Sequence, residues 1–449
     1  MLAVSASRSV LERAFIPQVQ PQGLPPGPRL PELFHSAQYG LDPYGFFLRA
    51  HRRFGDVFTV RVLGQTWVVL AHPDAARELF RQGPEDVNSG ETNVDLRPVL
   101  GTRNVGLLDG EEHLRRRRLV LPALRHERMP AYADLISEVA SRVVRALPTE
   151  APVAVLPHMR RITFEVLLRA VLGIDDPAQI RRLDAKLEAL LGWSMDQRRG
   201  AVFALLGPER LMAMRGFRRR HADLDADVLA EIRHRRHDPR LDEREDLLSR
   251  LVRVRDDRGE LLPDAELRDE LVTLLVAGQE TTGSLLGWAV HELARAPDAQ
   301  RRLGAGEEGY VDAVVRETLR LHPPLLIVLR RLRHALRLSG RELPAGTTVA
   351  LNVLLIHRRP DLYPEPHRFR PERFLDARPK PGEWLPFGGG GRRCLGAPLA
   401  ELEARLVLEE LARERTLRPD RARPERPGRR GIVTVPGRGA RVILSPRGA

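Results

Sequence analysis

The chain has a single cysteine, Cys394, in a loop whose composition points to thiolate chemistry. Four successive glycines, residues 388–391, and two arginines precede it. Glycine permits positive φ and close backbone approach, so such a loop can aim several N–H groups at one acceptor. A predicted helix begins just after the cysteine, and helix N-termini and nearby arginines both favour a thiolate. The pattern therefore predicts that the sulfur is held as an anion.

An isolated thiolate can be a nucleophile, a metal ligand or an inert core residue. A nucleophile needs a base within reach, and this loop offers no histidine. A lone cysteine excludes an intrachain disulfide and a zinc site built on several thiolates, and an inert buried cysteine is common. The spacing F-x-x-G-x-R-x-C-x-G favours a metal ligand instead, and its fixed places are filled by Phe387, Gly390, Arg392, Cys394 and Gly396.

This loop resembles the haem-binding loop of the cytochrome P450 superfamily, the haem-thiolate monooxygenases. The resemblance implies haem b as cofactor, with Cys394 as the axial ligand of the iron and electron donation from sulfur assisting O–O cleavage. It also implies that Phe387 packs beside the ligand loop and that Arg392 pairs with a haem propionate. Gly390 and Gly396 would let the loop and the following helix approach the porphyrin.

A second family mark is the E-x-x-R sequence formed by Glu317 and Arg320. Residues three apart share one face of a helix and can form an ion pair. Such pairs are frequent in an arginine-rich chain and contribute little when exposed. The resemblance implies that Arg373, in the segment before the cysteine loop, completes a triad with this pair. The role of the triad would be to support the haem-binding core.

The longest predicted helix carries Ala277, Gly278, Glu280, Thr281 and Thr282, which match the oxygen-activating stretch of the same family. A glycine and an acid inside a buried helix are costly unless they serve a site. The resemblance implies that Gly278 leaves room for a ligand over the iron and that Thr281 hydrogen-bonds dioxygen. Glu280 with water would relay protons. A threonine hydroxyl bonded back to the preceding helical turn is the alternative, above all for Thr282.

Two further segments are similar to propionate-binding segments of the family. His113 and Arg117 lie four residues apart, on one helical face, where both can reach a carboxylate. After the prolines at 323 and 324, Arg330 takes the place of another propionate-pairing arginine, with the adjacent Arg331 as the alternative register.

The elements that must position these residues are mostly helices. Pro263 and Pro297 bound the longest one, about 50 Å at ~1.5 Å per residue, with Asp264 predicted to cap its start. Apolar spacing predicts further helices at 73–80, 132–147, 162–172, 178–192, 209–236 and 399–414. Alternation predicts a hairpin at 57–70 and strands at 347–355, 432–435 and 440–444. The fold class is mainly α with a smaller β part, and the resemblance implies the triangular-prism cytochrome P450 fold, with haem between the central helix and the Cys-loop helix.

The chain is expected to form one haem-binding domain over residues 24–449 after a flexible tail at 1–23. It contains no run of ~18–20 apolar residues that could span a bilayer. The expected protein is therefore soluble and cytoplasmic, although the proline-rich lead-in at 17–31 leaves a loose membrane contact open. The resemblance to the soluble bacterial type implies a monomer that receives electrons from a ferredoxin and its reductase.

Composition bears on the class of function. The formal charge is +13, and all but two of the 73 basic residues are arginine. Nucleic-acid binding is disfavoured, because the arginines are spread over the chain and aromatic residues are only 5%. A non-enzymatic haem protein is a further, less favoured interpretation. The predicted function is a monooxygenase acting with dioxygen on a hydrophobic small molecule, of fatty acid, terpenoid, steroid or macrolide type. A peroxide-driven peroxygenase or a haem isomerase on the same fold is the alternative.

The substrate is expected above the haem, between the central helix and four largely apolar segments, 87–106, 191–217, 325–329 and 433–435. Basic residues 115, 116, 118 and 393 are expected on the proximal surface, where they could attract an acidic electron donor.

Overall fold

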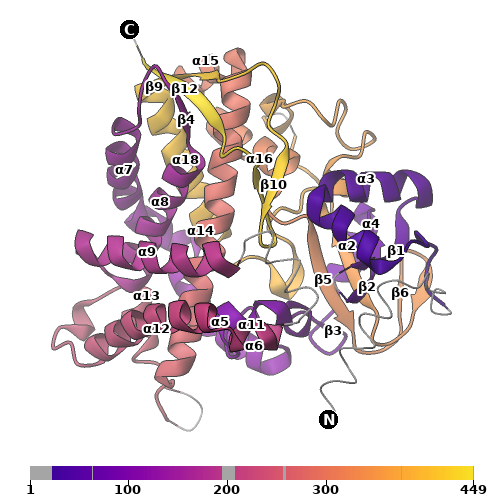
Figure 1. The fold of residues 1–449 in the computed structure, drawn as a ribbon, viewed down its shortest axis with the longest axis horizontal. Helices are drawn as coiled ribbons and strands as arrows, with labels where there is room; N and C mark the ends of the chain where they lie inside the picture. Colours follow the sequence, from indigo (N-terminus) through magenta and orange to yellow (C-terminus); the bar gives the residue numbers. More distant parts are fainter. Residues whose placement is uncertain (1–22, 63, 195–207, 256–258, 376, 448–449) are drawn as a thin grey trace.

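The computed structural model describes residues 23–62, 64–194, 208–255, 259–375 and 377–447. The predicted tail at 1–23 therefore lies almost wholly outside the described residues. The larger part of the molecule is helical and contains the long helix α14, and a smaller sheet-containing part lies to one side of it (Figure 1). This arrangement confirms the predicted fold class. Within the described ranges, no helix is both long and apolar enough to cross a bilayer.

Helix α14 (Asp264–Arg295) occupies the centre of the helical part, between the two predicted prolines. Its middle is buried on nearly every face, which explains why its sequence is apolar all round. It packs against α8 (Leu156–Leu167), α18 (Ala397–Glu414) and α16 (Tyr310–Leu321). The prediction that Asp264 caps it was wrong: Pro263 is the cap residue, and Asp264 lies in the first turn, where its carboxylate accepts from Arg236 at 2.8 Å.

The largest sheet has the order β1-β2-β8-β5-β3. Its strands are β1 (Val57–Val62), β2 (Gln65–Leu70), β8 (Thr348–Asn352), β5 (Ile327–Leu332) and β3 (Val87–Asn88). Only the β2–β8 pair is parallel among these strands. Aromatic side chains of α2 (Glu32–Leu41) and α3 (Pro43–Phe54) pack with Trp67 in the core on one face.

The strand predicted at 347–355 ends early. It stops at Asn352, and the short helix α17 (Val353–His357) follows directly. The Asn352 side chain accepts a hydrogen bond from the backbone N–H of Leu355 at 2.9 Å. Asparagine at this position satisfies a free helical donor, which is the physical reason for the switch from strand to helix.

The remaining elements surround this core. The helices are α4 (Pro73–Phe80), α5 (Arg97–Leu100), α6 (Gly110–Val120), α7 (Met129–Arg145), α9 (Pro177–Ser194), α11 (Pro208–Ala213), α12 (Arg215–Arg236), α13 (Leu247–Leu251) and α15 (Pro297–Gly304). The smaller sheets pair β4 (Pro152–Ala154), β12 (Arg441–Pro446) and β9 (Arg415–Pro419), then β10 (Pro427–Arg430) with β11 (Val433–Pro436), and β6 (Leu336–Leu338) with β7 (Arg341–Leu343).

Two predicted helices differ from the observed ones. The helix expected over 209–236 is broken at Met214, which is extended (φ −71°, ψ 128°) and separates α11 from α12. Methionine carries no local signal for such a break, so spacing alone could not find it. The helix expected over 162–172 begins earlier, as α8, and its last five residues form a π-turn that ends at Gly173 in the left-handed region.

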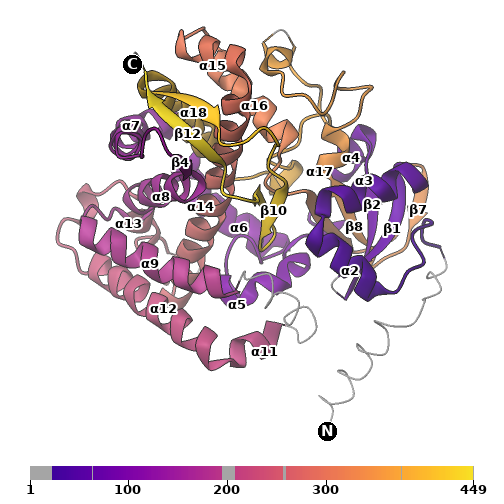
Figure 2. The same ribbon diagram turned by 45° about the horizontal axis from the view of Figure 1, so that its top comes forward.

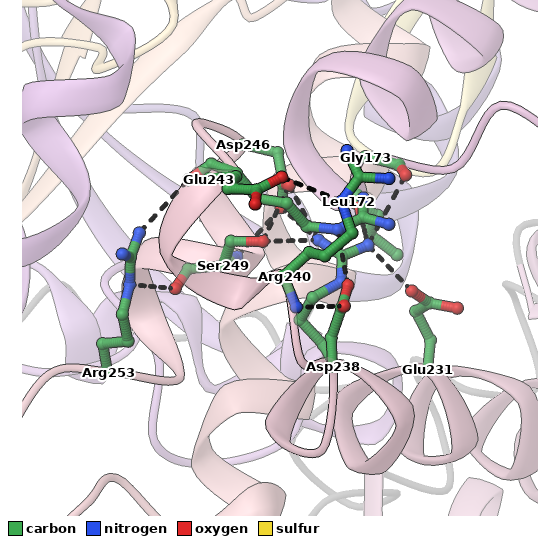
Figure 3. Close-up of polar contacts among 11 residues, drawn as sticks. Leu172, Gly173, Glu231, Asp238, Arg240, Glu243, Asp246, Ser249 and Arg253 are labelled. Atoms are coloured by element: carbon green, nitrogen blue, oxygen red, sulfur yellow. Dashed lines mark hydrogen bonds and ion pairs between the residues drawn. The ribbon is translucent and has the colours of Figure 1, made fainter.

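A buried arginine joins α12 to its neighbours. Helices α9 and α12 run side by side (Figure 2), and Arg235 on α12 is 1% exposed. Its guanidinium donates to Asp246 at 2.7 Å, to Ser249 at 2.6 Å, to Glu231 at 2.9 Å and to the carbonyl of Leu172 at 2.7 Å. Figure 3 labels these four partners. These charge-assisted bonds fix α12 against α13 and the end of α8.

Candidate functional site

A cavity of about 410 Å³ lies beside the middle of α14 and is bounded by the Cys394 loop, β5 and α18. Its wall is mostly apolar, with side chains that include Val105, Leu274, Ala277, Leu325, Val328 and Leu329. Segments 87–106 and 325–329 contribute to it, as predicted from the sequence. Within the described residues, neither 191–217 nor 433–435 lines it.

Cys394 lies on this wall, with its side chain exposed to the cavity. Its backbone N–H donates to the carbonyl of Phe387 at 2.9 Å, which closes the loop. Burial raises the pKa of the Cys394 thiol, whereas N–H groups of Gly396 and Ala397 and the guanidinium of Arg117 lower it. The stabilising donors therefore follow the cysteine, at the start of α18, and do not come from the four glycines as the loop composition had suggested.

The glycines of the loop have different surroundings. A Cβ on Gly390 would lie 2.6 Å from the carbonyl oxygen of Phe80, and this residue has φ +64°. Gly390 therefore lets the loop pack against α4, away from the cavity. Gly396 does line the cavity, and a Cβ there would meet no atom within 4 Å. Phe387 also lines the cavity and packs on Trp384, with ring centroids 5.9 Å apart.

Positive charge gathers at one end of the cavity. Arg117, Arg330 and Arg392 all line it. Arg392 donates to the carboxylate of Asp109 at 2.6 Å, and Arg117 donates to the carbonyl of Arg393 at 2.8 Å. Burial lowers the pKa of Arg330 to about 10 and that of Arg392 to about 10. Both guanidiniums are desolvated, and the one carboxylate of Asp109 acts on both arginines. Positive charge therefore exceeds negative charge around them.

His113 completes this end of the cavity. Burial and the charges of Arg392 and Arg117 lower the pKa of His113 to about 3, so its imidazole is neutral at pH 7. Arg331 instead points to the surface and pairs with Glu91 at 3.4 Å. The structure thus brings Arg330, and not Arg331, to the cavity. A surplus of guanidinium groups beside a cavity-facing cysteine fits a ligand with two carboxylates and a thiolate-seeking metal, which are the features of haem.

The α14 residues are divided between the cavity and the core. Ala277, Gly278, Thr281 and Thr282 line the cavity. A Cβ on Gly278 would lie 2.7 Å from a methyl carbon of Leu167, so this glycine lets α8 approach α14 closely. The hydroxyl of Thr281 donates to the carbonyl of Ala277 at 2.7 Å. The back-bonding expected above all for Thr282 is therefore found at Thr281, whose oxygen can still accept a hydrogen bond.

Glu280 lies away from the cavity wall. It is 2% exposed and forms ion pairs with Arg160 and, at 2.9 Å, with Arg430. The same two arginines each bind Glu188 at 2.7 Å. Two carboxylates and two guanidiniums thus form a closed ring that joins α8, α9, α14 and β10. Proton relay by Glu280 stays a prediction from the motif, and its observed contacts are those of an ion-pair hub.

The structure brings the three residues of the predicted triad together. Arg320 donates to Glu317 at 2.6 Å, and Arg373 donates to the same carboxylate at 3.1 Å. Arg320 and Glu317 have no exposed surface, and Arg320 also donates to the carbonyl of His357 at 2.8 Å. The triad thereby ties α16 to the segment that leads into the cysteine loop.

Sequence reasoning missed two acidic residues at this site. Asp109 accepts hydrogen bonds from the N–H groups of Ser89, at 2.7 Å, and Gly90, at 2.8 Å, as well as from Arg392. Its place directly before a helix start was the available signal. Glu403 lines the cavity from α18. The only available signal was the position of this acid on the buried face of the predicted helix. Arg116, predicted on the donor surface, is buried and paired with Glu266, so that prediction was wrong.

A cysteine that faces an apolar cavity below a long helix, with guanidiniums at one end, defines a haem-thiolate protein. A model of the family described as "Cytochrome P450" matches residues 24–306 and 309–441. The chain is 37% identical over 432 residues to a "Putative cytochrome P450 135A1" of Mycobacterium tuberculosis, covering 95% of this chain and 96% of that protein. It is 38% identical over 436 residues to a "Putative cytochrome P450 135B1" of Mycobacterium bovis, covering 94% and 91%.

Solved structures share the fold. A "Retinoic acid bound cyanobacterial CYP120A1" superposes with a TM-score of 0.81 at 26% identity, covering 94% of this chain and all of that chain. A "cytochrome P450DA heme domain" has the same TM-score at 22% identity, covering 94% of this chain and 98% of that one. The chain belongs to the cytochrome P450 family. It is a haem-dependent oxidoreductase of the monooxygenase class, as the sequence predicted.

Proposed function

We propose that this protein inserts one atom of dioxygen into a hydrophobic small molecule and reduces the other atom to water, using electrons from a ferredoxin and its reductase. The observation that carries the proposal is the placement of Cys394 and Thr281 on one apolar cavity. A hydroxyl that can accept a hydrogen bond thereby faces the same space as the thiolate. Location in the cytoplasm, a single domain over 24–449 and a monomeric state stay predictions.

Haem held by Cys394 would supply the redox centre at which dioxygen is activated, and the thiolate would donate electron density to the iron. The protein's own contribution is to hold and orient. Arg117, Arg330 and Arg392 offer charge-assisted hydrogen bonds to the two propionates, and neutral His113 adds a further donor. The Thr281 oxygen can accept a hydrogen bond from a water in the cavity, which holds a proton where reduction needs one.

The wall of the cavity supports a hydrophobic substrate. Its Leu and Val side chains offer contact area without hydrogen bonds, so apolar surface of the ligand decides binding. Ser89 and Asn93 add polar groups to the lining, which could orient one polar substituent. The structural relative at 26% identity was solved with retinoic acid, an apolar chain that ends in a carboxylate. A fatty acid, terpenoid, steroid or macrolide therefore remains the proposed substrate class.

A peroxide-driven reaction is the alternative on the same site. The motif with Glu280 and Thr281 argues against it, because a peroxygenase needs no proton relay for dioxygen. The ion-pair ring binds Glu280, so the support from Glu280 is weaker than the support from Thr281. The test must therefore distinguish a peroxide-driven reaction from one that uses dioxygen.

The test has a spectroscopic and a catalytic part. The dithionite-reduced protein with carbon monoxide should give the difference spectrum of a thiolate ligand, and Cys394→Ser should abolish it. With ¹⁸O₂ and a ferredoxin system, products from a screen of hydrophobic compounds should carry the label. Thr281→Ala should lower the amount of product formed per electron consumed. Thr281→Ser keeps the hydroxyl and should keep the wild-type ratio. Incorporation of ¹⁸O from labelled peroxide alone, with the product formed per electron unchanged in Thr281→Ala, would count against this function.

A further inference from the structure

The cavity wall contains a segment that has neither helix nor strand, residues 101–106, which we call the strap. Its last two residues, Val105 and Gly106, line the cavity. A loop supplies no ladder partners for its amide groups, so each one needs another acceptor where water is excluded. Two consecutive carboxylates of α14, Asp269 and Glu270, provide acceptors for the strap.

The two carboxylates hold different ends of the strap. Asp269 accepts from the N–H of Thr102 at 2.7 Å and from that of Arg103 at 3.0 Å. Glu270 accepts from the N–H of Val105 at 3.0 Å. Consecutive side chains on a helix point about 100° apart, since an α-helix has ~3.6 residues per turn. The two acids can therefore reach amides three residues apart in the strap.

Glu270 is the anchor nearer to the cavity. It has no exposed surface, and it lies one helical turn before Leu274, which lines the cavity. The carbonyl of Val105 accepts from Arg392 at 3.3 Å. Val105 is thus held at its N–H by an acid of α14 and at its carbonyl by an arginine of the cysteine loop. This residue of the wall cannot shift without losing a hydrogen bond to a buried side chain.

An ion pair with Arg116 is the alternative reason for a buried acid at this place. Nη1 of Arg116 lies 3.9 Å from Oε2 of Glu270, which is too far for a hydrogen bond, and Nη2 of Arg116 binds Glu266. Among the described residues, neither Nη1 of Arg116 nor Oε1 of Glu270 has a hydrogen-bond partner. The bond to the Val105 amide is therefore the one that the Glu270 side chain makes in the described part of the chain.

This bond does not depend on the charge of the acid. Burial raises the pKa of Glu270 to about 7, although the charge of Arg116 acts to lower it. A carboxyl oxygen can accept the Val105 N–H in the ionised and in the protonated form. The feature that the strap requires from Glu270 is thus an acceptor at the right distance.

We propose that Glu270 is a positioning residue for the substrate: by holding the Val105 amide it fixes the strap, which limits the size and orientation of the ligand that the cavity binds. This inference rests on the proposed function, because it takes the cavity as the substrate site. Asp269 fixes the outer end of the strap. A bulky ligand that contacts the wall gains from an ordered strap, whereas a ligand that contacts only the haem iron does not.

Hydrogen exchange tests the anchor directly. In the ferric holoenzyme, Glu270→Leu should raise amide exchange of the strap several-fold, because leucine has a similar size and no acceptor. Glu270→Gln should keep the wild-type rate, since its amide oxygen can accept the Val105 N–H. Glu111→Leu, at an exposed position on α6, is the control and should also keep it.

Two outcomes of this experiment would overturn the inference. An ion-pair role predicts the same rise in Glu270→Leu and Glu270→Gln, because both lack the charge. Wild-type exchange in Glu270→Leu would show that the strap needs no anchor. If Glu270→Leu does not fold, Glu270→Asp keeps the charge and shortens the side chain by one methylene. It should raise exchange of the strap, and an unchanged rate would again overturn the inference.

Ligand size tests the effect on the cavity. Imidazole and clotrimazole both bind ferric haem iron through an azole nitrogen, and the Soret shift reports their Kd, but only clotrimazole is bulky enough to fill the cavity. Glu270→Leu should weaken clotrimazole several-fold and leave imidazole unchanged, and Glu270→Gln should restore the wild-type Kd. Equal weakening of both ligands would indicate a general loss of structure and overturn the inference.

These measurements separate the inference from the proposed function. Neither exchange nor azole binding involves turnover, so a wild type that forms no labelled product from ¹⁸O₂ would defeat the proposed function and leave the anchoring of the strap standing. An active wild type whose strap and clotrimazole affinity do not respond to Glu270→Leu would defeat this inference alone.

Discussion

The guanidinium of Arg392 donates to the carboxylate of Asp109 at 2.6 Å, which ties the loop of the haem ligand to the start of α6. The same carboxylate accepts from the N–H groups of Ser89, Gly90 and Glu91 at 2.7–2.9 Å. One side chain therefore joins two segments of the cavity wall. Its charge also offsets part of the positive charge of Arg392, which keeps the guanidinium in place before a propionate binds.

Replacing Asp109 by alanine should destabilise the protein by about 2–4 kcal/mol. A fully buried donor that loses its acceptor costs roughly 1–3 kcal/mol, and the four donors to Asp109 lose less because they are only partly buried and water can replace the carboxylate. Haem should also dissociate faster, since Arg392 and the loop lose their common anchor. Urea unfolding and haem transfer to an excess of apomyoglobin measure the two effects. Glu111→Ala, an exposed acid on the same helix, is the control. Equal haem loss in both variants would contradict the anchoring role.

The ion-pair ring makes a second prediction, for Glu280→Gln. Removing one charge from a buried pair leaves Arg160 and Arg430 poorly compensated and should cost about 3–5 kcal/mol in the free energy of unfolding. Product formed per electron, measured on the folded variant, tests the proton relay that the motif predicts. Asp298→Asn, which breaks an exposed pair with Arg301, should leave stability unchanged. Poor coupling with normal stability would instead restore the relay role that the motif suggests.

The parts of the site that the sequence predicted are those encoded by short, fixed spacings. Cys394 and Arg392 lie in one loop, and Glu317 and Arg320 lie one helical turn apart, so local geometry fixes their relation. The fold class followed in the same way, from apolar periodicity and the prolines that bound α14.

What could not be predicted depends on contacts between distant segments. Glu280 is bound by Arg160 and Arg430, which lie 120 residues before it and 150 after it in the chain. Motif spacing carries no information on such partners. It therefore could not show that Glu280 lies in the ion-pair ring and not on the cavity wall. The prediction that Arg116 lies on the surface was wrong for the same reason, because its partner Glu266 lies on α14. In a chain with so many arginines, charge alone does not distinguish surface from core.

A third prediction concerns the pH dependence of stability. His357 has no exposed surface, and its Nε2 accepts the N–H of Leu385 at 2.8 Å, which requires the neutral ring. Burial and the charge of Arg320 lower the pKa of His357 to about 3. The unfolded chain binds this proton below its ordinary pKa of about 6.5, and the folded protein does so only near 3, so the folded state loses stability as the pH falls through this window.

The measurement is the free energy of unfolding in urea at pH 6.5 and pH 5 for wild type and His357→Gln. Glutamine can accept the same hydrogen bond without titrating, so the difference between the two proteins isolates this group. The wild type should lose up to about 2 kcal/mol more than the variant over this range. His234→Gln, at an exposed position on α12, controls for the loss of a histidine. Parallel pH profiles for wild type and His357→Gln would show that the ring is not held neutral.

The last prediction concerns the electron donor. Arg115 and Arg118 are exposed on α6, the helix whose Arg117 donates to the carbonyl of Arg393 in the cysteine loop. An acidic ferredoxin attracted to this surface would approach the haem from the thiolate side. The double change Arg115→Glu and Arg118→Glu should therefore slow reduction by the donor at least tenfold at low salt, because charge complementarity governs association rates.

Stopped-flow reduction over a salt series tests this docking surface. The difference between variant and wild type should shrink as the Debye length falls from ~10 Å at 0.1 M to ~3 Å at 1 M salt, because screening removes the long-range attraction. Reduction by dithionite should be unchanged, since it needs no docking. Arg337→Glu with Arg341→Glu, exposed on β6 and β7 in the sheet-containing part, makes the same change in net charge elsewhere. If that control slowed reduction equally, net charge and not the α6 surface would steer the donor.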